Sequence, residues 1–124
     1  MIEKARENLR AAGCLIDEGC PNAAASRAYY AAYQACWWAL EKTGEEPPEP
    51  RPGERWWPHK EISGISRRFL IGFETDDEDD FDNILLFRRI KADYDPDPVL
   101  EYEVRECVHI AGDLLEKIAG GDLE

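Results

Sequence analysis

The segment 88–94, RRIKADY, combines side chains that could bind a charged ligand. A guanidinium group binds phosphate oxygens through paired N–H donors, and a nearby phenol adds a further donor. Arg89 and Asp93 are four residues apart, so on a helix they could also form a local ion pair. The segment therefore predicts either an anion site or a pair of surface charges with a purely structural role.

A histidine elsewhere in the chain would add proton transfer to this chemistry. His59 stands at the expected start of another helix. If its imidazole reached Arg89, the arginine would hold a phosphate, His59 would move protons and Tyr94 would donate a hydrogen bond. These three are the candidate catalytic residues. His109 follows Arg105 by four positions and is predicted to pack in the bundle or to pair at the surface.

A second group of polar side chains lies on the alanine-rich segment 22–43. Ser26, Tyr30 and Tyr33 follow one another at spacings of four and three, which places them on one helical face. Buried hydroxyl groups need hydrogen-bond partners, so these residues either link neighbouring helices or bind a ligand. The candidate binding residues are Arg88, Asp93, Ser26, Tyr30 and Tyr33.

Motifs for other kinds of chemistry do not occur in the sequence. It contains neither a Gly-x-Ser-x-Gly nucleophile motif nor a Gly-x-x-x-x-Gly-Lys phosphate loop. The four cysteines, Cys14, Cys20, Cys36 and Cys107, have no C-x-x-C spacing, so we expect small core residues rather than metal ligands. No metal and no cofactor is predicted.

The elements that must position these side chains are helices. Apolar residues spaced three and four apart predict a first helix from Ile2 to Ile16, ended by Gly19 and Pro21. The second helix, over 22–43, is apolar on nearly all sides and must be covered on most of them.

The second half of the chain contains a proline-rich connection and further helices. Five prolines within 44–58 predict a loop, which is followed by helices over 58–73 and 82–93. Asp97-Pro98 predicts the start of a last helix, which Gly120-Gly121 ends. We expect an all-α, up-and-down antiparallel helical bundle of four main elements with an extra short helix.

Bulk composition limits the kinds of partner. A length of 124 residues predicts a single domain over 1–124, and the sequence has no apolar run long enough to span a membrane, so we expect a cytoplasmic protein. The net charge of −12 disfavours indiscriminate binding to nucleic acid. An acidic run at 74–82 carries seven carboxylates, and arginines flank it on both sides.

At these residues the chain resembles the HEPN family, in particular its branch of small stand-alone proteins. The matching stretches are AAASRAYYAAYQACWWAL at 23–40, Pro58-His59, and RRIKADYDPDPV at 88–99. They occur in the family's order and cover most of the chain. The resemblance implies a helical bundle that forms homodimers and, in many members, acts with a small nucleotidyltransferase encoded beside it, often as a toxin–antitoxin pair.

Several HEPN branches are metal-independent ribonucleases, and the resemblance bears on that activity too. Their motif is an arginine followed four to six residues later by a histidine. Here Arg88 or Arg89 stands at the arginine position, and Asp93 and Tyr94 occupy the region of the histidine. The leading hypothesis is therefore a binding module for a nucleotidyltransferase and a nucleotide phosphate. The alternatives are a ribonuclease toxin with a non-standard site acting on RNA, and a structural interaction bundle.

Overall fold

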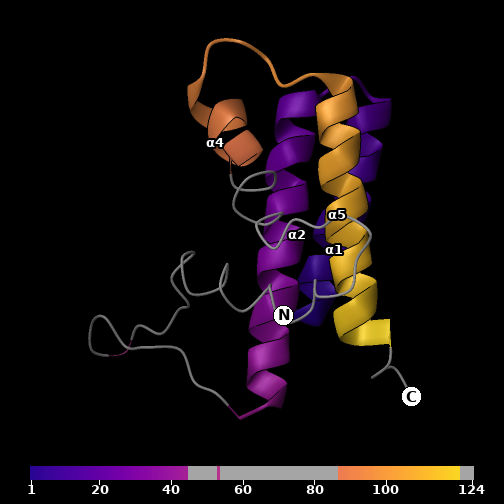
Figure 1. The fold of residues 1–124 in the computed structure, drawn as a ribbon, viewed down its shortest axis with the longest axis vertical. Coiled ribbons are helices and arrows are strands. Elements are labelled where there is room, and N and C mark those ends of the chain that lie inside the picture. Colours follow the sequence, from indigo (N-terminus) through magenta and orange to yellow (C-terminus); the bar gives the residue numbers. More distant parts are fainter. Residues whose placement is uncertain (45–52, 54–86, 121–124) are drawn as a thin grey trace.

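The computed structural model describes residues 1–44, 53 and 87–120 of the chain. Within these ranges the chain forms α1 (Ile2–Asp17), α2 (Pro21–Lys42), α4 (Phe87–Tyr94) and α5 (Glu101–Ala119), and no strand. Figure 1 shows α1, α2 and α5 running side by side, with α4 against one end of α2. The direction of α1 is opposite to that of α2 and α5. The predicted all-α helical bundle is confirmed.

A tight turn joins α1 to α2 and fixes their antiparallel arrangement. Gly19 adopts φ +77°, a left-handed conformation that glycine reaches without steric cost. The backbone N–H of Gly19 donates to Ile16 O at 3.0 Å, and that of Cys20 donates to Leu15 O at 2.7 Å. Pro21 then begins α2, where a missing N–H costs nothing. Both boundaries lie within about two residues of those predicted from sequence.

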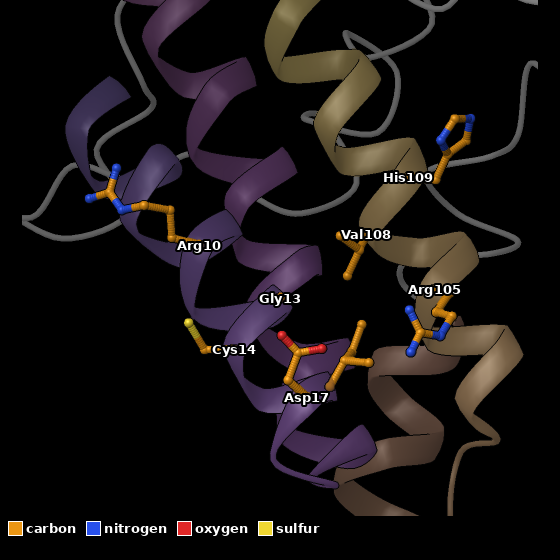
Figure 2. A pocket seen from close by; sticks show the side chains of 8 residues that line it. Arg10, Gly13, Cys14, Asp17, Arg105, Val108 and His109 are labelled. Atoms are coloured by element: carbon orange, nitrogen blue, oxygen red, sulfur yellow. The ribbon is translucent and has the colours of Figure 1, made fainter.

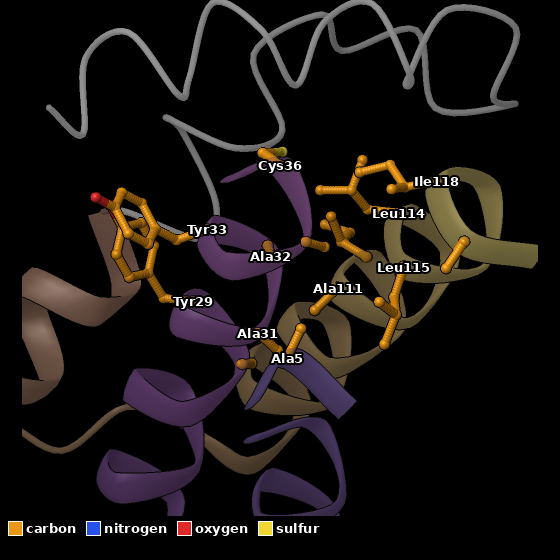
Figure 3. Packing of buried hydrophobic residues seen from close by; sticks show 14 of the residues in the cluster. Ala5, Tyr29, Ala31, Ala32, Tyr33, Cys36, Ala111, Leu114, Leu115 and Ile118 are labelled. Carbon is orange, nitrogen blue, oxygen red and sulfur yellow. The ribbon is translucent and has the colours of Figure 1, made fainter. Parts of the chain in front are cut away.

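Small residues along α2 let the neighbouring helices approach closely. Ala28, Ala31, Ala32 and Ala35 are completely buried, and side chains of α5 such as Leu114 pack against them. Figure 3 shows Ala31 and Ala32 of this group among the packed side chains, with Tyr29 and Tyr33 on the side of α2 that faces α4. The apolar surface of α2 is therefore largely covered within one chain, so its composition alone does not require a second copy.

The last helix begins later than its sequence predicts. The expected start was Asp97-Pro98, whereas α5 starts at Glu101 after extended backbone at Leu100. The reason is Val99, which is buried (1% exposed) and donates its backbone N–H to Asn22 Oδ1 at 2.9 Å. A helical turn there would break both contacts. The Glu103 carboxylate instead accepts from the Leu100 N–H at 3.1 Å, as in half of a capping box.

The prediction that all four cysteines are core residues is wrong for two of them. Cys36 and Cys107 are buried, whereas Cys14 and Cys20 are exposed. Cys14 lies on the outer side of α1, and Cys20 precedes the first turn of α2, where the chain passes over the surface. The predicted helix over 82–93 is described from Phe87 onward as α4, and it ends at Tyr94, within one residue of the predicted end. The predicted helix over 58–73, the acidic run and most of the proline-rich loop lie outside the described residues.

None of the helices described in 1–44 and 87–120 has both the length and the apolar character needed to cross a bilayer.

Candidate functional site

The two polar groups singled out from the sequence meet in one network between α2 and α4. Ser26 Oγ donates to Asp93 Oδ1 at 2.8 Å, and Arg89 Nη2 donates to the Tyr30 hydroxyl at 3.1 Å. Asp93 Oδ2 lies 3.0 Å from Arg89 Nε. The helical repeat explains this geometry, because Ser26 and Tyr30 are one turn apart on α2 as Arg89 and Asp93 are on α4.

The ion pair within this network is short but poorly aligned. Arg89 Nε is fully shielded from solvent and forms no hydrogen bond within the described part of the chain, although Asp93 Oδ2 is only 3.0 Å away. The distance is short enough for an ion pair, but the Nε–H bond of Arg89 does not point toward Asp93 Oδ2 as a hydrogen bond requires. Because the two side chains keep 20% and 35% of their surface exposed, water screens part of the attraction.

Aromatic rings form the floor beneath the Arg89 guanidinium. Its central carbon lies 5.7 Å from the ring centroid of Tyr29 and 5.5 Å from that of Tyr30, both within range of a cation–π contact. The two rings pack edge to face at 5.2 Å, and Tyr33 stacks on Tyr29 at 6.3 Å. Burial, with a smaller electrostatic contribution from the neighbouring Tyr30, raises the pKa of Tyr33 to about 12. Tyr33 thus supports the ring cluster as a neutral phenol.

The neighbouring Arg88 faces α5 rather than α2. Its Nη1 donates to Glu103 O at 3.0 Å and to Glu106 Oε1 at 2.8 Å, and its Nε lies 3.4 Å from Glu103 Oε2. The Lys91 ammonium is 3.8 Å from Glu103 Oε1. Arg88 is therefore an anchor between α4 and α5 and points away from the Arg89 network. The sequence analysis missed Glu103 and Glu106, although two acidic residues three apart on α5 opposite a basic segment were a usable signal.

The three candidate catalytic residues do not share one described location. Arg89 lies in the network against α2, whereas the Tyr94 side chain is 74% exposed on the outer side of α4. His59 lies outside the described residues. The ribonuclease alternative, which needs a proton carrier beside Arg89, therefore gains no geometric support from the described residues.

His109 forms a surface pair, but with a different partner from the one predicted. Its Nε2 lies 3.1 Å from Asp113 Oδ2, and Arg105 pairs with Glu101 at 2.8 Å. Each pair is an i, i+4 contact along α5. His109 and Arg105 do not pair with each other, since each finds a carboxylate one turn away along α5.

Basic residues line a groove between α1 and α5, but their charged groups do not converge on one point. It has a volume of about 560 Å³ and is lined in part by Arg10, Asp17, Arg105 and His109. Figure 2 shows Arg10 and His109 pointing out of the groove on opposite sides, while Asp17 and Arg105 extend toward its middle. An anion entering the groove would meet the Asp17 carboxylate, so this surface is not a second anion site.

The network at α2 and α4 can present a fixed guanidinium edge to an anion. Tyr30, Asp93 and the two rings restrict the side chain of Arg89, so little conformational freedom remains to be lost on binding. In the described ranges no three His, Cys, Asp or Glu side chains are grouped to hold a metal ion.

No protein-family model, curated protein or solved structure matches this chain. The resemblance to HEPN proteins therefore stays a prediction based on the residues quoted above.

Proposed function

We propose that this chain is a HEPN-like homodimeric binding module that acts with a small nucleotidyltransferase, in a toxin–antitoxin type of pair, and holds a nucleotide phosphate at Arg89. The observation that carries the proposal is the network of Ser26, Tyr30, Arg89 and Asp93. These residues come from two of the three stretches on which the resemblance rests, and Ser26 and Tyr30 lie 59 to 67 positions before Arg89 and Asp93 in sequence.

The electrostatics favour a small anion over a long nucleic acid. A net charge of −12 repels an extended phosphate backbone. One phosphate needs only a local donor set, and Arg89 supplies N–H groups that are already oriented by Tyr30 and Asp93. The Asp93 carboxylate lowers the net charge of the site, so we expect modest affinity, in the range of about 10 µM to 1 mM.

A structural interaction bundle is the alternative that one observation favours. Both oxygens of Asp93 have partners within the chain, as does the guanidinium of Arg88. In this alternative, the charges of α4 serve only to dock the helix on α2 and α5. Arg89→Ala would then change the stability of the fold and would leave the binding of any ligand unchanged.

Calorimetric titration of the purified chain with ATP separates the two functions. We expect saturable binding that falls by at least about tenfold in Arg89→Ala. Arg105→Ala is the matched control, because Arg105 is an exposed arginine paired one turn away on α5. Equal ATP affinity in both variants, or no heat of binding to the unmodified chain, would contradict nucleotide binding at Arg89 and favour the structural alternative.

The partner is tested separately. Co-expression with the product of an adjacent gene, if that gene encodes a nucleotidyltransferase, should give a complex that survives affinity purification and gel filtration. Light scattering at micromolar concentration should give the mass of a dimer. A monomeric mass and no co-purifying partner would contradict this part of the proposal whatever the outcome with ATP.

A further inference from the structure

The outer side of α4 displays apolar side chains to solvent. A surface helix normally turns its large apolar residues toward the core. On α4, however, Ile90 is 45% and Tyr94 is 74% exposed. The sides of α4 that face its neighbours carry charges instead: Arg89 and Asp93 toward α2, and Arg88 toward α5. Charged contacts thus attach the helix and leave its apolar side open.

These exposed residues line a concave surface. Ile90 and Tyr94 are one helical turn apart, and together with Lys91, Asp95 and Pro96 they surround an open groove of about 480 Å³. The side chain of Ile90, the ring of Tyr94 and Pro96 form the apolar walls of the groove. The groove is open to solvent and does not enclose a ligand on most sides, so it suits side chains of a docked peptide better than a buried small molecule.

Carboxylates lie at and beside the groove: Asp95 lines it, and Asp97 follows two residues later in the same exposed stretch. The Lys91 ammonium is shared with Glu103, which lies 3.8 Å away. Asp95 and Asp97 are exposed, and neither has an ion-pair partner within the described ranges; Asp95 Oδ1 only accepts the Asp97 N–H at 2.9 Å. The carboxyl end of α4 adds a partial negative charge at the same place.

We infer that this groove docks a protein segment that carries an arginine or lysine beside an aliphatic side chain. The aliphatic group packs on Ile90 and Pro96, and the cation reaches Asp95 or the ring of Tyr94. A second copy of this chain is the competing occupant, and the mass measurement below distinguishes it from a different protein. The inference is independent of the nucleotide proposal, since Ile90 and Tyr94 lie on another face of α4, about 100° around the helix from Arg89 and Asp93.

Two synthetic peptides test the inference on the full chain, one alternating leucine with arginine and one alternating leucine with glutamate. Each is titrated into isotope-labelled protein and followed by NMR. We expect the arginine peptide to shift the amide signals of Ile90, Lys91, Tyr94 and Asp95, with an affinity at least about tenfold above that of the glutamate peptide. Added salt should lower the affinity of the arginine peptide, because salt screens the attraction between its cations and the carboxylates.

Matched variants locate the contact. Tyr94→Ser should lower the affinity for the arginine peptide by about fivefold or more. Tyr102→Ser should not, because Tyr102 is a comparably exposed tyrosine (68%) that does not line the groove. Equal binding of both peptides, amide shifts confined to other residues, or equal effects of the two variants would overturn the inference. A lower molecular mass of Tyr94→Ser in light scattering would also overturn it, since the occupant would then be a second copy.

Discussion

Arg89 donates a hydrogen bond from Nη2 to the hydroxyl oxygen of Tyr30 at 3.1 Å, across 59 positions of sequence. This bond connects α4 to the long central helix α2, and the ion pair of Arg89 with Asp93 lies beside it. Because none of the side chains described over 88–94 is a fully buried apolar group, such polar contacts help to determine where α4 sits.

Tyr30→Phe should loosen α4 while leaving the ring packing intact. The variant removes the acceptor of a charged donor and leaves a half-buried guanidinium group without that partner. We expect a loss of about 1–2 kcal/mol in the free energy of unfolding measured with urea. Tyr102→Phe, at an exposed position of α5, should change this free energy by less than about 0.5 kcal/mol. Equal stabilities of the two variants would show that the hydroxyl contact contributes nothing.

Arg88→Ala should destabilise the fold more than Arg105→Ala. The Arg88 side chain is 17% exposed and bonds to a backbone carbonyl and two carboxylates of α5, whereas Arg105 is 59% exposed with one partner. We expect losses of about 1–3 kcal/mol for Arg88→Ala and under about 0.5 kcal/mol for Arg105→Ala in urea unfolding. A reversed order would mean that α4 is not anchored through Arg88.

Thiol reactivity should divide the cysteines into two pairs. Cys14 and Cys20 are exposed and should be alkylated rapidly by iodoacetamide near neutral pH, as peptide mass spectrometry can record. Cys36 and Cys107 should react only on unfolding, because both are buried and burial raises the pKa of the Cys107 thiol to about 11. Rapid alkylation of Cys36 in the folded chain would contradict the packing of α2 described above.

Stability should fall as the pH rises above about 9. Burial raises the pKa of Tyr33 from 10.0 to about 12 and that of Cys107 from 9.0 to about 11, with Arg88 partly opposing the shift at Cys107. The unfolded chain therefore releases these protons first, and the stability held below pH 9 is lost through pH 11 to 12. Urea unfolding of Tyr33→Phe should depend less steeply on pH above 10 than that of the unmodified chain. Parallel pH profiles would contradict the assigned role of Tyr33.

The sequence predicts the long elements well because each carries several consistent signals. The apolar stripe of α1, the alanines of α2 and the glycines at helix ends all depend on local geometry. The start of α5 could not be predicted in the same way, since Asp97-Pro98 resembles a helix start. That stretch stays extended because the Val99 N–H donates to the distant Asn22 side chain and because Val99 is buried.

The candidate site could be predicted only in part. The i, i+4 spacings suggested that Ser26, Tyr30, Arg89 and Asp93 lie on helix faces, but not that the two faces meet. The different directions of Arg88 and Arg89 also could not be read from a sequence in which the two stand side by side. Rotation of about 100° per residue sends one to α5 and its neighbour to α2.

The short turn between α1 and α2 has a consequence for how the protein folds. These two helices share the most extensive interface in the described structure and are joined by only three residues, so their hairpin closes with little loss of chain entropy. Contacts between α2 and α4 must wait until a far longer stretch of chain has been closed. We therefore expect Arg89 to reach its partners late, so that a chain emerging from the ribosome gains this charged surface only after α4 has been synthesised.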